Sequence, residues 1–188
     1  MLELSSDIDP GLDDLFRAWC DHHHAEVIAL PGVLRARRYL RADRRPGPAR
    51  YLTIYDLASV SVLDTPAFLN HGRTGTPMPD VLGPSLVYQR TVATLVGRAG
   101  DISGTEVLVR AAGVRDEATS LAARLVVPLS GAGPVTGARV FRVHDGPDDR
   151  LLVLLDCTDD ADDLGTVMAT GPWQEAVVYR RVFDRSAT

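Results

Sequence analysis

The expected secondary structure follows the same order twice in this chain of 188 residues. Helical spacing of apolar residues and strict alternation predict strand, helix, strand, strand, helix, strand in residues 1–96, and the same order in residues 105–183. Local matches indicate a true repeat: ARRYL (36–40) with ARVFR (138–142), YLTIYD (51–56) with LLVLLD (151–156), and GPSLVYQRTV (83–92) with GPWQEAVVYRRVF (171–183).

The first helix has the clearest signals for its two ends. Asp9 is a plausible N-cap with Pro10 at the first helical position, and Pro31-Gly32 ends the helix after Leu30. The other expected elements of the first half are strands at 1–8, 33–41, 51–57 and 85–96 and a short helix at 61–70. Those of the second half are strands at 105–113, 138–144, 150–157 and 175–183 and helices at 115–129 and 159–170.

A β-α-β-β-α-β unit is the ferredoxin-like arrangement, and it leaves one face of its sheet apolar. Two such sheets packed face to face remove both apolar faces from water, and here one chain supplies both. We therefore expect an α+β protein with two ferredoxin-like repeats, residues 1–98 and 104–188, forming an intramolecular pseudo-dimeric α+β barrel. The linker is GRAGDISG, residues 97–104.

Composition disfavours several classes of protein. A net charge of -5 without a long basic stripe disfavours nucleic-acid binding, and the basic run at 35–45 reads as a strand with solvated arginines. No leader and no window of about 18 apolar residues is present, so we expect a cytoplasmic protein without a membrane partner. Cys20 and Cys157 are far apart and form no CxxC pair, which disfavours a disulfide framework or structural zinc site.

The segment FRAWCDHHHAEVIALPG, with Phe16, Trp19, His23 and Pro31-Gly32, resembles the first-helix signature of EthD-like members of the dimeric α-β barrel superfamily. ARRY and RYLTIYDL look like the second and third strands of that group, so the resemblance covers about residues 1–95. It implies a cavity between sheet and helices that admits a mostly apolar small molecule. The positions equivalent to Trp19 and His23 in the second half are Leu121 and Leu125, so we expect the first repeat to carry any site.

The three consecutive histidines are expected to differ. His23 lies in the apolar stripe of its helix, while His22 and His24 fall to either side, at exposed or edge positions. Adjacent helical residues point about 100° apart and cannot converge on one ion, and neither Glu26 nor His71 is spaced to suggest a further ligand, so no metal is expected. His23 is either a hydrogen-bonded core residue or a general acid/base, because an imidazole titrates near neutral pH.

Other side chains complete the candidate site. Tyrosines across the cavity would bind a carbonyl or enolate oxygen, or else line the barrel wall. His71 lies in the irregular segment NHGRTGTPMPD (70–80), which is either a lid or an ordinary connection. Alternation lets only one of Arg37 and Arg38 point inward, and we expect solvated arginines for at least two of Arg37, Arg38 and Arg90. The candidates are His23 and Tyr51 for catalysis, and Trp19, Tyr39, Tyr55, His71, Tyr88 and Arg90 for substrate binding.

The resemblance implies a small-molecule enzyme that needs no cofactor and acts on a polyketide-like or aromatic substrate, as a cyclase, isomerase, dehydratase or monooxygenase. His23 would be its general acid/base. Two alternatives stay open: a non-catalytic ligand-binding or structural barrel, and a haem-dependent enzyme. The expected partner is an apolar or aromatic small molecule, and the expected state is a monomeric pseudo-dimer or a homodimer.

Overall fold

The computed structural model describes residues 1–42, 49–101, 107–114, 135–144, 151–157 and 175–187. They form two compact units: residues 1–40, 45–91 and 182–188 belong to the first, and residues 41–44 and 92–181 to the second. The expected repeat boundaries, 1–98 and 104–188, differ from the bounds of these units. The second unit begins its long segment at residue 92, within the strand that covers residues 87–100. None of the helices described is both long and apolar enough to cross a membrane.

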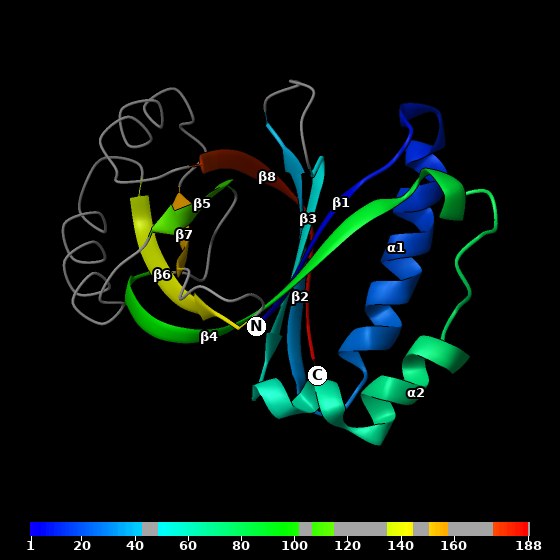
Figure 1. Ribbon diagram of the computed structural model, residues 1–188, viewed down its shortest axis with the longest axis horizontal. Helices are drawn as coiled ribbons and strands as arrows, with labels where there is room; N and C mark the ends of the chain where they lie inside the picture. The colour runs from blue at the N-terminus through cyan, green and yellow to red at the C-terminus, as the bar shows by residue number, and fades with distance from the viewer. Residues whose placement is uncertain (43–48, 102–106, 115–134, 145–150, 158–174, 188) are drawn as a thin grey trace. The chain divides into compact units, whose positions relative to one another are not determined.

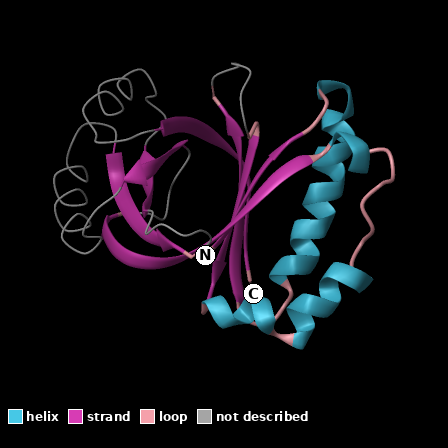
Figure 2. Ribbon diagram, in the orientation of Figure 1, coloured by secondary structure: helices cyan, strands magenta, loops and turns pink. Residues whose placement is uncertain are grey.

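The first unit has a three-stranded antiparallel sheet covered by two helices. Its elements are β1 (Leu2–Asp7), α1 (Asp13–Ile28), β2 (Val33–Arg41), β3 (Tyr51–Leu57) and α2 (Pro66–Thr74). β3 pairs with both β1 and β2, and both helices lie on the same side of these strands (Figures 1 and 2). The bounds of β2 and β3 confirm the strands expected at 33–41 and 51–57.

Local signals explain where α1 begins and ends. The Asp9 side chain accepts a hydrogen bond from the Gly11 amide at 2.8 Å and caps a 3₁₀ turn, Pro10–Leu12, that leads into the helix. After the helix, Gly32 adopts a φ of +86°, and a Cβ there would lie 2.6 Å from a methyl group of Val62. Both the left-handed backbone and the close approach require glycine at this turn.

One core of this unit combines side chains of α1 and β3 with two side chains from outside these elements. Its buried members are Ile8, Phe16, Cys20, Tyr51 and Leu82. A surface hollow of about 360 Å³ borders this core at Ile8 and is lined by Asp7, Ile8, Asp9, Ser85 and Val87. No residue of the expected site lines that hollow.

Both arginines in the middle of β2 are buried, each with 1 % of its surface exposed. Arg37 donates to Asp56 on β3 at 2.5 Å, and Arg38 donates to Asp21 on α1 at 2.8 Å. The expectation that only one points inward, and that at least two of Arg37, Arg38 and Arg90 are solvated, is wrong. Alternation does send the two side chains to opposite faces, but each face offers a carboxylate that offsets the desolvation of the guanidinium.

The second unit is a five-stranded antiparallel sheet in the order β4, β6, β7, β5, β8. These strands are β4 (Val87–Gly100), β5 (Val107–Val114), β6 (Val135–Val143), β7 (Leu151–Cys157) and β8 (Glu175–Ser186). Two of them belong to this unit only in part: β4 with residues 92–100 and β8 with residues 175–181. Residues 97–100 of the expected linker continue β4. The helices expected at 115–129 and 159–170 lie outside the described residues.

The β6–β7 pair has the same internal geometry as the β2–β3 pair of the first unit. Arg37 is opposite Ile54, and Arg139 is opposite Leu154; the register shifts between Val33 and Arg35 in one pair and between Val135 and Gly137 in the other. Arg139 donates to both carboxylate oxygens of Asp156, at 2.9 and 2.6 Å. The Arg37–Asp56 ion pair of the first unit therefore has a counterpart at the matching position of the second.

Candidate functional site

The three consecutive histidines of α1 lie in three different environments. His22 is exposed, His23 is partly buried and His24 is 3 % exposed. The expectation that His24 is exposed or at an edge is wrong, because its ring packs edge-on against Tyr55, with ring centres 5.6 Å apart, and against Phe183 at 5.3 Å. Burial, helped by the charge of Arg38, lowers the pKa of His24 to about 3, so this ring is neutral at physiological pH.

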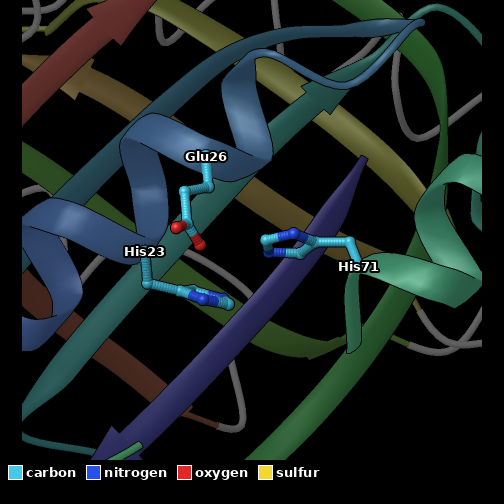
Figure 3. Close-up of side chains that lie close together, drawn as sticks. All are labelled: His23, Glu26 and His71. Carbon is cyan, nitrogen blue, oxygen red and sulfur yellow. The ribbon is translucent and has the colours of Figure 1, made fainter. Parts of the chain in front are cut away.

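His23 lies beside polar side chains of both α1 and α2. Figure 3 shows His23 and Glu26 on α1 and His71 on α2 with their side chains directed toward one another. One ligand-capable atom from each lies within 4.8 Å of those of the other two. The spacing of Glu26 and His71 in the sequence does not suggest them as ligands, yet the fold brings both next to His23.

His71 lies on a helix rather than in an irregular loop. Thr65 caps α2 by accepting a hydrogen bond from the Phe68 amide at 3.3 Å, with Pro66 at the first position, and the helix continues to Thr74. A Cβ at Gly75 would lie 2.5 Å from the His71 ring, so the small residue leaves room for that ring. The Thr-Pro start and the Gly75 stop are the sequence signals that place this helix at 66–74 instead of the expected 61–70.

Thr76 holds the Glu26 carboxylate in place. Its backbone amide donates to Glu26 Oε2 at 2.9 Å, and its hydroxyl donates to Oε1 at 2.5 Å. These two hydrogen bonds lower the pKa of Glu26. The Thr76 carbonyl accepts a hydrogen bond from the Trp19 indole at 3.4 Å, so the segment after α2 is attached to α1 at two points. Sequence patterns alone do not indicate Glu26 or Thr76, because both contacts join segments far apart in the chain.

The environment of His23 favours a neutral imidazole. Its ring stacks on Trp19, with centres 4.8 Å apart and planes 18° apart, and the His71 ring lies 5.1 Å away. Burial and the neighbouring His71 lower the pKa of His23, while Glu26 opposes them. The buried Nδ1 of His23 and Nε2 of His71 have no hydrogen-bond partner within the described part of the chain.

The remaining expected site residues divide into core and surface residues. Tyr39, Tyr51 and Tyr55 are buried in the sheet. Tyr51 packs against Phe16, with ring centres 5.2 Å apart, and Phe16 lies 6.2 Å from Trp19. Burial and the nearby Asp13 raise the pKa of Tyr51 to about 12. Tyr88, 66 % exposed, and Arg90 lie in the solvent-exposed start of β4, so these two are not part of the group around His23.

A neutral imidazole with a free ring nitrogen can accept a proton, and two imidazoles with a carboxylate are also ligands for a transition-metal ion. The row of aromatic rings continues from His23 through the partly buried Trp19 to Phe16 and Tyr51, which are buried in the core. The arrangement therefore combines one polar, partly exposed cluster with an aromatic ring stacked on its imidazole, and polar groups next to aromatic side chains are common in small-molecule sites.

No protein-family model matches the sequence. No curated protein matches it either. Solved structures do match. A crystal structure of an anthrone oxidase-like protein aligns with a TM-score of 0.69 and 11% identity, over 99% of this chain and 92% of the other.

Two further structures carry the name "putative monooxygenase". The one from Fusobacterium nucleatum aligns with a TM-score of 0.59 and 9% identity, over 98% of this chain and 93% of the other. The one from Lactobacillus acidophilus aligns with a TM-score of 0.57 and 9% identity, over 99% and 95%. The chain therefore shares the fold of these three proteins, in alignments that cover nearly all of it.

Proposed function

We propose that this chain is a small-molecule enzyme in which His23 transfers a proton to or from an aromatic or polyketide-like substrate without a cofactor. The observation that carries the proposal is the state of His23: partly buried, stacked on Trp19, with a lowered pKa and an unpartnered Nδ1. A neutral imidazole of this kind accepts a proton from an acidic C–H or phenol.

An anthrone is the first substrate to test, because one structural neighbour is named an anthrone oxidase-like protein. His23 would remove the proton from the carbon opposite the carbonyl, and the resulting enolate would add O₂ to form a hydroperoxide once protonated. Loss of water then gives the quinone, so one anthrone and one O₂ yield one anthraquinone and one water. Tyr51, whose raised pKa keeps its hydroxyl protonated, is the proposed donor to the carbonyl oxygen.

We also propose that the chain is EthD-like and arose by tandem duplication. Its two repeats would form an intramolecular pseudo-dimer, with the site in the first repeat. Three features support the duplication: the matching registers of β2–β3 and β6–β7, the matching positions of their register shifts, and the paired Arg37–Asp56 and Arg139–Asp156 bridges. Register follows from the side-chain pattern of the paired strands, so two strand pairs with the same register, the same shift and the same bridge share a sequence pattern.

The test compares His23→Ala with His22→Ala in protein freed of metals by a chelator, using anthrone and dissolved O₂. We expect O₂ uptake and quinone absorbance with the native chain, and a rate about 10²- to 10⁴-fold lower for His23→Ala. His22 is the matched control because it is exposed on the same turn of α1. Equal rates for the two folded variants would contradict the role of His23.

A non-catalytic barrel is the second candidate, and the core of Phe16, Cys20, Tyr51 and Leu82 beneath α1 favours it. It predicts no turnover of anthrones, phenols or β-diketones by the native chain. Added haemin distinguishes the haem-dependent alternative, because a haem bound by a histidine gives a Soret band that is lost in the variant lacking that histidine.

A further inference from the structure

We propose that His23, Glu26 and His71 form a binding site for a divalent transition-metal ion. His23 and Glu26 are three residues apart on α1, so both side chains project from the same face of that helix. His71 approaches from α2, and the ligand-capable atoms of the three lie within 4.8 Å of one another. Two separate helices thus supply two imidazoles and one carboxylate to one point (Figure 3).

The free ring nitrogens point to an absent ligand. His23 Nδ1 and His71 Nε2 are both buried, and neither has a hydrogen-bond partner among the residues that the structure describes. A buried polar atom without a partner costs about 1–3 kcal/mol, so a compensating interaction at these rings stabilises the folded chain. A metal ion that accepts a lone pair from each imidazole supplies it.

The carboxylate is already oriented for this role. Both oxygens of Glu26 accept hydrogen bonds from Thr76, and each keeps a second lone pair for a metal. Stacking on Trp19 limits the rotation of the His23 ring in the same way. Hydrogen bonds and packing that orient the ligands are typical of metal sites, where their loss weakens affinity about 10- to 100-fold.

The donor set selects the kind of ion. Two imidazoles and one carboxylate suit Zn²⁺ or Fe²⁺, whereas Ca²⁺ and Mg²⁺ prefer oxygen ligands. Bonds of about 2.0–2.2 Å place ligand atoms about 3–3.5 Å apart, so small rotations of the side chains must bring the three closer than the present spacing. His23, Glu26 and His71 are all partly exposed, so an ion can enter and its remaining positions stay open to water or substrate.

Metal binding uses the same side chains as the proposed function but does not depend on it. Binding is measured without substrate, and turnover is measured in chelator-treated protein. Absence of metal binding therefore leaves the proton-transfer proposal intact, and absence of turnover leaves the metal site intact.

The experiment is a titration of tag-free, chelator-treated protein with Zn²⁺ by calorimetry and with Co²⁺ by visible absorption. We expect one ion per chain, with affinity at least about 10-fold weaker in His71→Ala and in Glu26→Gln. Circular dichroism verifies that both variants are folded. Because Gln keeps the shape of Glu26 and an oxygen that accepts from Thr76, Glu26→Gln tests the charge and not the packing.

His22→Ala is the decisive control. His22 Nε2 lies 3.5 Å from Glu26 Oε1, so these two residues form an alternative two-ligand chelate on the surface of α1. The proposed site predicts unchanged affinity in His22→Ala and weakened affinity in His71→Ala. The reverse pattern, or no Zn²⁺ binding by the native chain at micromolar concentrations, would overturn the proposal.

Discussion

The β2–β3 pair of the first unit and the β6–β7 pair of the second share a register and an Arg–Asp bridge but differ in the residues around them. One face of β3 carries Tyr51, Thr53 and Tyr55, whereas the matching positions of β7 are Leu151, Val153 and Leu155. All six side chains are buried. The shared frame is therefore compatible with either a polar aromatic interior or an aliphatic one.

The bridges themselves differ in exposure. The Asp56 side chain is 33% exposed, whereas the Asp156 side chain is fully buried at 0%. Water can therefore solvate the carboxylate in the first unit but not in the second. A buried charge without its partner destabilises the folded state, so the second unit relies on its Arg–Asp bridge for stability. The first unit tolerates polar groups near its surface, including the His23 cluster.

The largest expected effect separates the two bridges. Arg139→Met leaves the Asp156 carboxylate without its guanidinium partner, and we expect a loss of about 3–5 kcal/mol in the free energy of unfolding. Arg37→Met should lose only about 1–2 kcal/mol, because water reaches Asp56. Chemical denaturation measures both values.

The control for this pair of variants is Arg139→Met combined with Asp156→Leu. An apolar replacement of both partners should recover most of the lost stability, because no buried charge remains. Equal losses in the two single variants would mean that exposure of the carboxylate does not distinguish the bridges.

The second effect concerns His24, which the first unit buries and whose matching position in the proposed second repeat is Val126. The folded chain holds the pKa of His24 at about 3, against an ordinary value of 6.5. The unfolded chain therefore binds a proton below pH 6.5 that the folded chain does not, so stability falls as the pH falls toward 3. We expect a contribution of about 2 kcal/mol between about pH 7.5 and about pH 5.

His24→Leu should remove that part of the pH dependence while keeping the site filled. The measurement is the denaturation midpoint of both proteins at the two pH values. His22→Leu is the control, since it makes the same replacement at an exposed position of the same helix. An unchanged pH dependence in His24→Leu would show that His24 is protonated in the folded protein.

The fold of the described residues followed from sequence patterns wherever the pattern is local. Alternation predicted the observed bounds of β2 and β3, and Gly32 marked the turn after α1. Asp9 and Pro10 begin a 3₁₀ turn, Pro10–Leu12, so α1 itself starts later than expected, at Asp13. Sequence patterns predicted the residues of the candidate site less completely than the fold. One apolar stripe selected His23, but His24 is buried by Phe183 near the other end of the chain, and Glu26 is fixed by Thr76. Contacts between segments distant in sequence leave no periodic signal, so only the structure assembles the cluster.

The third effect tests the support of Glu26. Thr76→Val removes the hydroxyl that donates to Oε1 and keeps the backbone amide. We expect a small fall in the denaturation midpoint and a rise in the Glu26 pKa, seen by NMR titration, because the hydrogen bond that favours the charged carboxylate is lost. Thr74→Val is the control, because its hydroxyl donates to the Asn70 carbonyl on an exposed turn at 3.1 Å and should matter less. Equal effects would show that Thr76 does not orient the carboxylate.

The smallest effect is expected from Thr53→Val, which makes β3 more like β7 at a single position. Thr53 lies opposite Arg38, and its counterpart Val153 lies opposite Val140. Thr53→Val exchanges a buried hydroxyl for a methyl group of similar size in a strand, so we expect stability to change by less than about 1 kcal/mol. Denaturation midpoints and anthrone turnover should be measured together. A larger loss of stability would show that the hydroxyl makes a structural hydrogen bond, whereas a loss of turnover alone would assign β3 to the substrate site and explain why the two strands differ.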